Sequence, residues 1–179
     1  NRMKAFLKVG KSVSFPLDVP QYLSSINRTE ASAADAEAKL TLPKDQILHA
    51  QFWFIKTTPL DEVAFNHLFA GEIDKAEEIW QKRECLSALQ NLIVCALIRN
   101  KYDFAIKCAE VLYGNTQYLN QFVSTIIGTG GNFDVSSLAF SFLDILCDEI
   151  SASKLLPFIT NSSWKEHLGE RAVKPLVDS

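Results

Sequence analysis

The sequence is poor in the residues that interrupt or cross-link a chain. Its 179 residues include only seven glycines, six prolines and four cysteines, and it has no Cys-x-x-Cys pair. A chain of this length buries enough apolar surface to fold without disulfides or a structural metal. We therefore interpret the cysteines as reduced core residues in a reducing compartment. They are Cys85, Cys95, Cys108 and Cys147.

Long apolar runs and an excess of positive charge are also missing. No run approaches the roughly 20 apolar residues of a membrane span, and the first residues lack the apolar block of a signal peptide. The formal net charge of −3 gives no general basis for binding nucleic acid. We expect a soluble, cytoplasmic protein without a membrane or nucleic-acid partner. Arg2, Lys4, Lys8 and Lys11 make the first turns basic, as a solvated face or a partner contact.

The patterns that carry enzyme chemistry are absent as well. His49, His67 and His167 lack the spacing of metal ligands on one helix face, and no Gly-x-Ser-x-Gly sequence indicates a nucleophile. The glycine-rich stretch 128–131 lacks the lysine of a phosphate-binding loop. We predict no catalytic residue, no metal site and no bound cofactor, and so a protein that is not an enzyme.

What the sequence does contain is helical periodicity almost throughout. Apolar residues recur at helical spacing from 30 to 40, 58 to 70, 73 to 82, 86 to 100, 103 to 113, 117 to 127 and 133 to 150. The stretch from Pro43 to Lys56 is apolar nearly all round, which predicts a central, heavily buried helix. Thr58 and Pro59 form a strong helix start, and Gly71 a helix end. No stretch is typical of a strand, so we predict an all-α fold.

The domain organisation follows from where the periodicity begins. Residues 1–26 hold the end of a truncated helix and a connector with Gly10, Pro16 and Pro20. Residues 27–179 form a single all-α domain. Because the chain opens on Asn1 and closes without an obvious ending, we expect it to be an excerpt of a longer protein.

A short pattern repeats at a fixed interval. Gly71-Glu72-Ile73-Asp74-Lys75-Ala76 and Asn100-Lys101-Tyr102-Asp103-Phe104-Ala105 lie 29 residues apart, and Gly131-Asn132-Phe133-Asp134 suggests a third turn. Helix pairs at such a period indicate stacked antiparallel hairpins. The pattern resembles the tetratricopeptide repeat (TPR) over about residues 58–147. The architecture is then a TPR-like α-solenoid, or an irregular helical bundle.

The TPR resemblance also bears on how a partner is held. TPR modules that clamp a chaperone's carboxylate tail present lysine and asparagine from their first helices. The matching positions here are Asp61, Phe65, Gln90, Val94 and Ile98. We therefore expect that clamp to be absent.

A second resemblance rests on three short segments. Residues 1–6 (Asn1 to Phe6), 52–56 (Phe52 to Lys56) and 60–65 (Leu60 to Phe65) are similar to the region that follows a J-like domain in bacterial DnaJ-related chaperone proteins. The resemblance implies a bacterial co-chaperone whose contact with a DnaK-type chaperone uses regions outside this chain, because the His-Pro-Asp loop is not in it.

The sequence therefore predicts a non-enzymatic protein–protein interaction module, which binds an unidentified protein or peptide. Asn66, His67 and Asn91 are the candidate partner contacts. One alternative is a helical ligand-binding domain or enzyme fragment with an apolar pocket near Phe52, Trp53 and His67. Another is a structural spacer between flanking domains.

Overall fold

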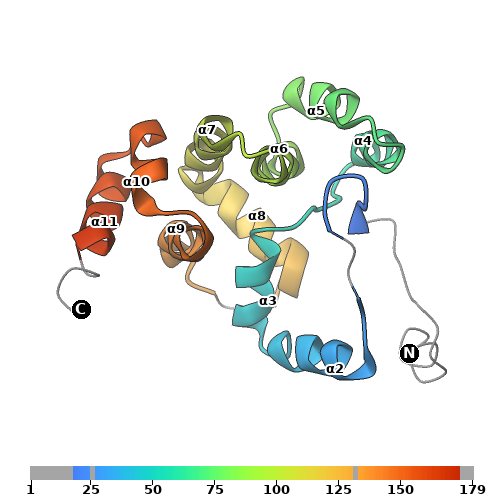
Figure 1. Ribbon diagram of the computed structural model, residues 1–179, viewed down its shortest axis with the longest axis horizontal. Helices are drawn as coiled ribbons and strands as arrows, with labels where there is room; N and C mark the ends of the chain where they lie inside the picture. The colour runs from blue at the N-terminus through green and yellow to red at the C-terminus, as the bar shows by residue number, and fades with distance from the viewer. Residues whose placement is uncertain (1–17, 25–26, 131–132, 174–179) are drawn as a thin grey trace.

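The computed structural model describes residues 18–24, 27–130 and 133–173, and within them it is helical without a strand (Figure 1). The predicted all-α fold is confirmed. The expected truncated helix and most of the connector lie outside the described residues. The α-helices are α2 (Glu30–Lys39), α3 (Pro43–Ala50), α4 (Pro59–Phe69), α5 (Ile73–Gln81), α6 (Leu86–Ile98), α7 (Tyr102–Tyr113), α8 (Thr116–Ile127), α9 (Leu138–Glu149), α10 (Ala152–Leu155) and α11 (Ser162–Val173). Two 3-10 turns join them, η2 (Val135–Ser137) and η3 (Leu156–Phe158).

Two helical hairpins of similar construction follow one another along the chain. Helix α4 packs on α5, α6 packs on α7, and the hairpins meet where α5 contacts α6. Both turns contain a residue with positive φ, Gly71 at 82° and Asn100 at 55°. In each turn this residue's N–H donates to the carbonyl three residues back at 3.1 Å. The next N–H donates to the carbonyl five residues back at 2.8 Å. The 29-residue interval therefore corresponds to two turns of the same backbone geometry.

The third repeat is not built in the same way. Gly131 and Asn132 lie outside the described residues. Ile73 and Tyr102 each begin an α-helix, whereas Phe133 lies in a loop before η2. Asp134 accepts a hydrogen bond from the Ser136 N–H at 3.0 Å and so caps a 3-10 turn. The prediction of a continuous α-helix from residue 133 is wrong for its first turn.

The helix predicted over residues 43–56 ends early. Helix α3 stops at Ala50, and the chain then crosses the molecule without regular structure until α4. Of the predicted helix's apolar side chains, Ile47, Phe54 and Ile55 are buried, whereas Trp53 is 36% exposed. The expectation of a central, heavily buried helix is therefore wrong.

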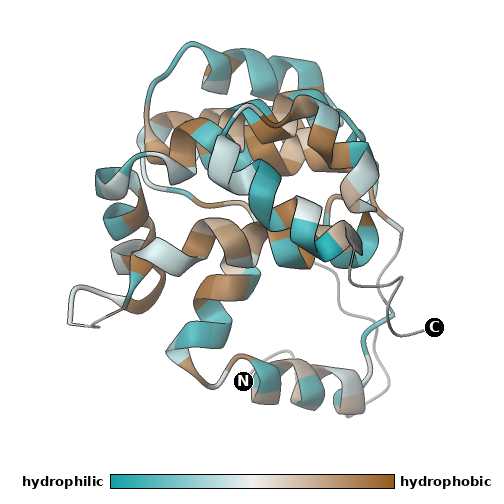
Figure 2. Ribbon diagram, turned by 90° about the vertical axis from the view of Figure 1, so that its left-hand side faces the viewer, coloured by the Kyte–Doolittle hydropathy of each residue, from teal (hydrophilic) through white to brown (hydrophobic). Residues whose placement is uncertain are grey.

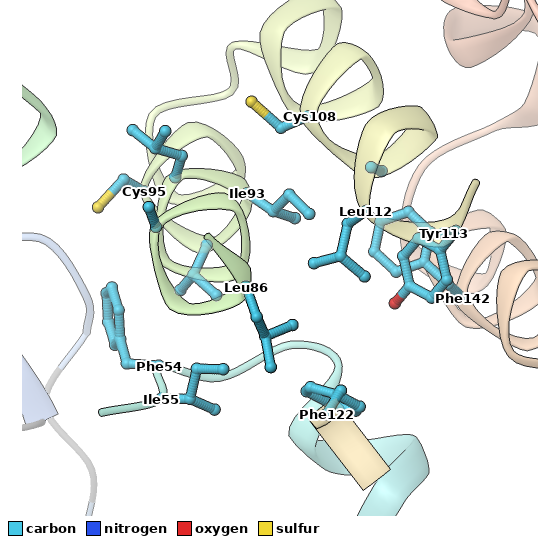
Figure 3. Packing of buried hydrophobic residues seen from close by; sticks show 14 of the residues in the cluster. Phe54, Ile55, Leu86, Ile93, Cys95, Cys108, Leu112, Tyr113, Phe122 and Phe142 are labelled. Carbon is cyan, nitrogen blue, oxygen red and sulfur yellow. The ribbon is translucent and has the colours of Figure 1, made fainter. Parts of the chain in front are cut away.

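Helix α6 is the central element. Nearly all of its residues from Leu86 to Ala96 are buried, because α6 packs against α5, α7 and the segment of residues 54 and 55. Figure 3 shows Phe54 and Ile55 lying below Leu86, with Phe122 of α8 beyond them. The helix predicted from residue 86 is thus confirmed, and it lies in the core.

Helix α2 lies at the edge of the molecule (Figures 1 and 2). Thr29 caps it through the Ser32 N–H at 3.0 Å, but Ala33 is its only buried residue. Its other alanines stay exposed. Helices α2 and α3 meet at a corner where the Gln46 side chain donates to the Leu40 carbonyl at 2.8 Å.

Candidate functional site

The structure separates the three residues predicted to contact a partner. Asn66 is exposed on α4. His67, on the same helix, is partly exposed, and its Nδ1 lies 2.7 Å from Glu72 Oε2. Asn91 is fully buried on α6. No single surface contains all three side chains.

Asn91 holds the chain's own backbone. Its Oδ1 accepts a hydrogen bond from the Ile55 N–H and its Nδ2 donates to the Ile55 carbonyl, both at 2.9 Å. This is the pair of main-chain bonds by which an asparagine can hold an extended peptide. Since Asn91 is fully buried and both ends of its amide bind Ile55, it is not accessible to a partner.

Gln90 extends the same arrangement. Its Nε2 lies within hydrogen-bonding distance of the carbonyl oxygens of residues 50, 51 and 53, at 3.3, 2.9 and 3.0 Å. Gln51, also fully buried, donates to Tyr113 Oη and to the Leu138 carbonyl at 2.9 Å. The segment from Ala50 to Ile55 is therefore fixed across α6. It covers the helix face along which the TPR resemblance would place a peptide.

The three residues of the predicted pocket, Phe52, Trp53 and His67, have different surroundings. Phe52 stacks on Phe142 of α9, with ring centroids 5.2 Å apart. His67 lies at the α4–α5 turn beside Glu72. Trp53 lines a cavity to which Phe52 and His67 do not contribute.

That cavity is an open groove of about 540 Å³, which we call the Trp53 groove. Its lining is mostly apolar and comes from α2, α3, the crossing segment and α8. The lining residues are Ala36, Lys39, Leu40, Gln46, His49, Ala50, Trp53, Phe54, Ile55 and Ile126. Leu40 is 42% exposed, and Leu42 at the nearby corner is 60% exposed. Exposed apolar side chains that gather around a groove are one mark of an interaction surface.

The formal charge of the groove lining is positive and comes from Lys39. Lys39 and His49 are its ionisable side chains, and no acidic residue is among the described residues that line it. Lys39 lies 2.9 Å from Asp35, with both side chains about two-thirds exposed. Such an exposed pair is weak and leaves the ammonium group free to exchange partners.

A second, more polar hollow lies between α9 and α11. It has a volume of about 430 Å³, and Cys147, Ser151, Ser153 and Arg171 are among its lining residues. Arg171 already pairs with Asp144 at 2.7 Å and with Asp148 at 2.5 Å. Burial raises the pKa of Cys147, which disfavours the reactive thiolate. The hollow therefore provides neither an activated nucleophile nor an unpaired cation.

The buried acidic residues have structural partners. Asp61 Oδ2 accepts hydrogen bonds from the N–H groups of Thr57 and Thr58 at 2.9 and 2.7 Å. Its Oδ1 accepts from Trp80 Nε1 at 3.0 Å. Glu77 pairs with Arg99 at 2.9 Å. These carboxylates join neighbouring helices and do not face the groove.

The cysteine side chains are free thiols, and burial raises the pKa of Cys108 to about 11. Cys95 and Cys108 are buried, whereas Cys85 and Cys147 are partly exposed. Within the part of the chain that the structure describes, no group of three or more His, Cys, Asp or Glu side chains could hold a metal ion. None of the described helices is both long and apolar enough to cross a membrane.

Sequence reasoning did not find most of the Trp53 groove. Its walls come from segments up to 90 residues apart, and the helix predicted over residues 43–56 would have placed Trp53 in the core. A usable signal was the pair Leu40 and Leu42 beside Pro43, since two leucines at a helix break have few neighbours to cover them.

Comparisons of this chain with protein-family models, with curated proteins and with solved structures found no match.

Proposed function

We propose that this chain is a non-enzymatic protein–protein interaction module that binds a peptide segment of its partner in the Trp53 groove. The observation that carries the proposal is the exposed apolar lining of the groove, with Leu40 and Trp53 at 42% and 36% exposure. The rest of the molecule supports this use, because α3 and α8 pack together and hold two of the groove's walls in a fixed relation.

The proposal places the partner away from the face that the TPR resemblance favours. That face of α6 is covered by the Ala50–Ile55 segment through Gln90 and Asn91. We nevertheless retain the TPR-like relation as a proposal for α4 to α7. Its support is the matching geometry of the turns at Gly71 and Asn100.

Membership of a bacterial, cytoplasmic DnaJ-related co-chaperone is a further part of the proposal. It is supported by the sequence resemblance in residues 1–6, 52–56 and 60–65, and free thiols suit a reducing compartment. In that setting a DnaK-type chaperone would bind through regions outside this chain. The test is whether a longer chain carrying this sequence stimulates a DnaK-type ATPase and loses that effect when the additional region is removed.

The peptide-binding proposal can be tested by unbiased selection from a displayed peptide library. The blocking variant is Ala36→Trp, which places an indole in the groove from an exposed position on α2. The matched control is Ala38→Trp, an exposed position on the same helix that does not line the groove. Peptides selected on the wild type should bind Ala38→Trp equally and Ala36→Trp at least tenfold more weakly. Equal binding to both variants, or no selection above a scrambled library, would overturn the proposal.

The alternative function as a ligand-binding domain is favoured by one observation, the volume of the groove, which lies in the range of small-molecule sites. The same variants decide between the two. Suppose that a small apolar molecule binds the wild type and Ala38→Trp but not Ala36→Trp, and that no selected peptide competes with it. That result would favour a small-ligand site over a peptide site.

A further inference from the structure

We infer that the segment which the Trp53 groove binds is an amphipathic helix that carries acidic side chains along one flank of its apolar face. The inference rests on the proposed function and adds the conformation and charge of the partner. It follows from the hydrogen bonds already made around the groove and from the sign of its charges.

Many of the main-chain groups beside the groove already take part in hydrogen bonds. The carbonyl oxygens of residues 50, 51 and 53 accept hydrogen bonds from Gln90. The main-chain N–H and carbonyl of Ile55 are both hydrogen-bonded to the Asn91 side chain. The Leu40 carbonyl accepts from Gln46. The described residues contain no strand edge to which a peptide could add.

An extended peptide would therefore lose water from its N–H and C=O groups without gaining partners in the groove, and each unpaired buried group costs free energy. A helix satisfies its own main-chain groups and presents only side chains. The lining offers apolar contacts for such side chains from Leu40, Trp53, Phe54, Ile55 and Ile126. The groove thus suits a helix better than an extended segment.

The charge on the partner follows from the lining. Lys39 and His49 are the ionisable groups that line the groove, and Lys39 pairs with Asp35 on the exposed side of α2. A carboxylate on the flank of an incoming helix can take the place of Asp35. A lysine at the same position would meet Lys39 directly, and like charges at close range repel.

The experiment titrates the wild type with synthetic helical peptides and follows tryptophan fluorescence. Trp53 is 36% exposed, whereas Trp80 and Trp164 are 0% and 4% exposed, so a change on binding in the groove reports mainly on Trp53. The probes share one apolar stripe and differ only on its flank, glutamate in one and lysine in another. A third probe has the glutamate flank and a central proline that breaks the helix.

The glutamate probe should bind about fivefold more tightly than the lysine probe, and the difference should shrink in high salt. The proline probe should bind at least tenfold more weakly than the glutamate probe. Lys39→Glu should remove or reverse the charge preference, whereas the control Lys82→Glu, an exposed lysine on another surface, should leave it unchanged. Trp53→Phe should abolish the fluorescence change.

Equal binding of the glutamate and lysine probes would overturn the inferred acidic flank. Equal binding of the proline and glutamate probes would overturn the inferred helical conformation of the partner. In either case, peptides from the unbiased selection that still distinguish Ala36→Trp from Ala38→Trp would leave the proposed function standing. Failure of that selection, by contrast, would remove the proposed function itself.

Discussion

Asp61 shows how much of this fold depends on one polar side chain. Only 1% of its surface is exposed, and it accepts hydrogen bonds from the start of α4 and from Trp80 of α5. Burial acts to raise its pKa, but the bonds from Thr57, Thr58, Ser87 and Trp80 outweigh burial and hold the pKa below its usual value. The sequence indicated a helix start at Thr58 and Pro59, whereas the link of Asp61 to α5 and α6 depends on contacts that periodicity does not show.

Replacing this carboxylate should be costly. We predict that Asp61→Asn lowers the free energy of unfolding by about 2–3 kcal/mol. The charge-assisted hydrogen bonds would weaken, and the NH2 group of the new side chain would face N–H donors that now bind a carboxylate oxygen. Urea unfolding followed by circular dichroism measures the change. Glu62→Gln is the control, since Glu62 is exposed and pairs only with Lys56 at 3.0 Å. If Asp61→Asn proved as stable as Glu62→Gln, the structural role assigned to the Asp61 carboxylate would be refuted.

The same carboxylate predicts a dependence on pH. Its pKa is lower in the folded than in the unfolded chain, so the unfolded chain takes up its proton first as the pH falls. Its contribution to stability is complete above the unfolded pKa of about 4 and is lost as the pH falls through the folded pKa. Urea midpoints from pH 7 to pH 2.5 should therefore fall more steeply for the wild type than for Asp61→Asn. Parallel curves would contradict the account.

At the scale of helices, the two hairpins depend on turns that need positive φ. At Gly71, with φ of 82°, an added Cβ would meet only Gln21 Cγ at 3.8 Å, so space is available and the backbone conformation is the obstacle. Gly71→Ala should therefore cost about 1–2 kcal/mol, whereas Asn100→Gly should be nearly neutral because glycine adopts positive φ freely. Thermal unfolding of both variants measures this. A neutral Gly71→Ala would show that the turns do not share this requirement.

The crossing segment gives a second prediction at this scale. Asn91→Ala leaves the buried N–H and carbonyl of Ile55 without their partner, which should cost about 2–4 kcal/mol. The Ile55 amide should then exchange its hydrogen much faster than in the wild type. Asn66→Ala, at an exposed position on α4, should change neither stability nor this exchange rate. Unchanged exchange at Ile55 in Asn91→Ala would mean that Asn91 does not fix the segment.

The whole molecule shows where sequence reasoning succeeds and where it stops. Local signals at Thr58, Pro59 and Gly71 were enough to predict the α4–α5 hairpin, because caps and positive φ are properties of a few adjacent residues. The end of α3 at Ala50 was not predictable in this way. There, Gln90 and Asn91, some 40 residues further on, supply the hydrogen bonds that a helix would otherwise supply.

The candidate site has the same limitation. Periodicity identifies Trp53 as apolar, but its exposure depends on where α3 ends and on how α2, α3 and α8 meet. Asn91 was predicted from the sequence as a candidate partner contact, and the structure shows that its amide binds the chain itself. The groove became apparent only once distant segments were placed together.

The claim that the Trp53 groove is the binding surface is tested most directly by backbone amide spectra of the protein, recorded with and without a peptide from the selection. The account predicts that the largest shift changes lie between residues 36 and 55 and at Ile126, with α10 and α11 nearly unchanged. Changes concentrated on α9 to α11, or on the outer face of α5, would contradict it.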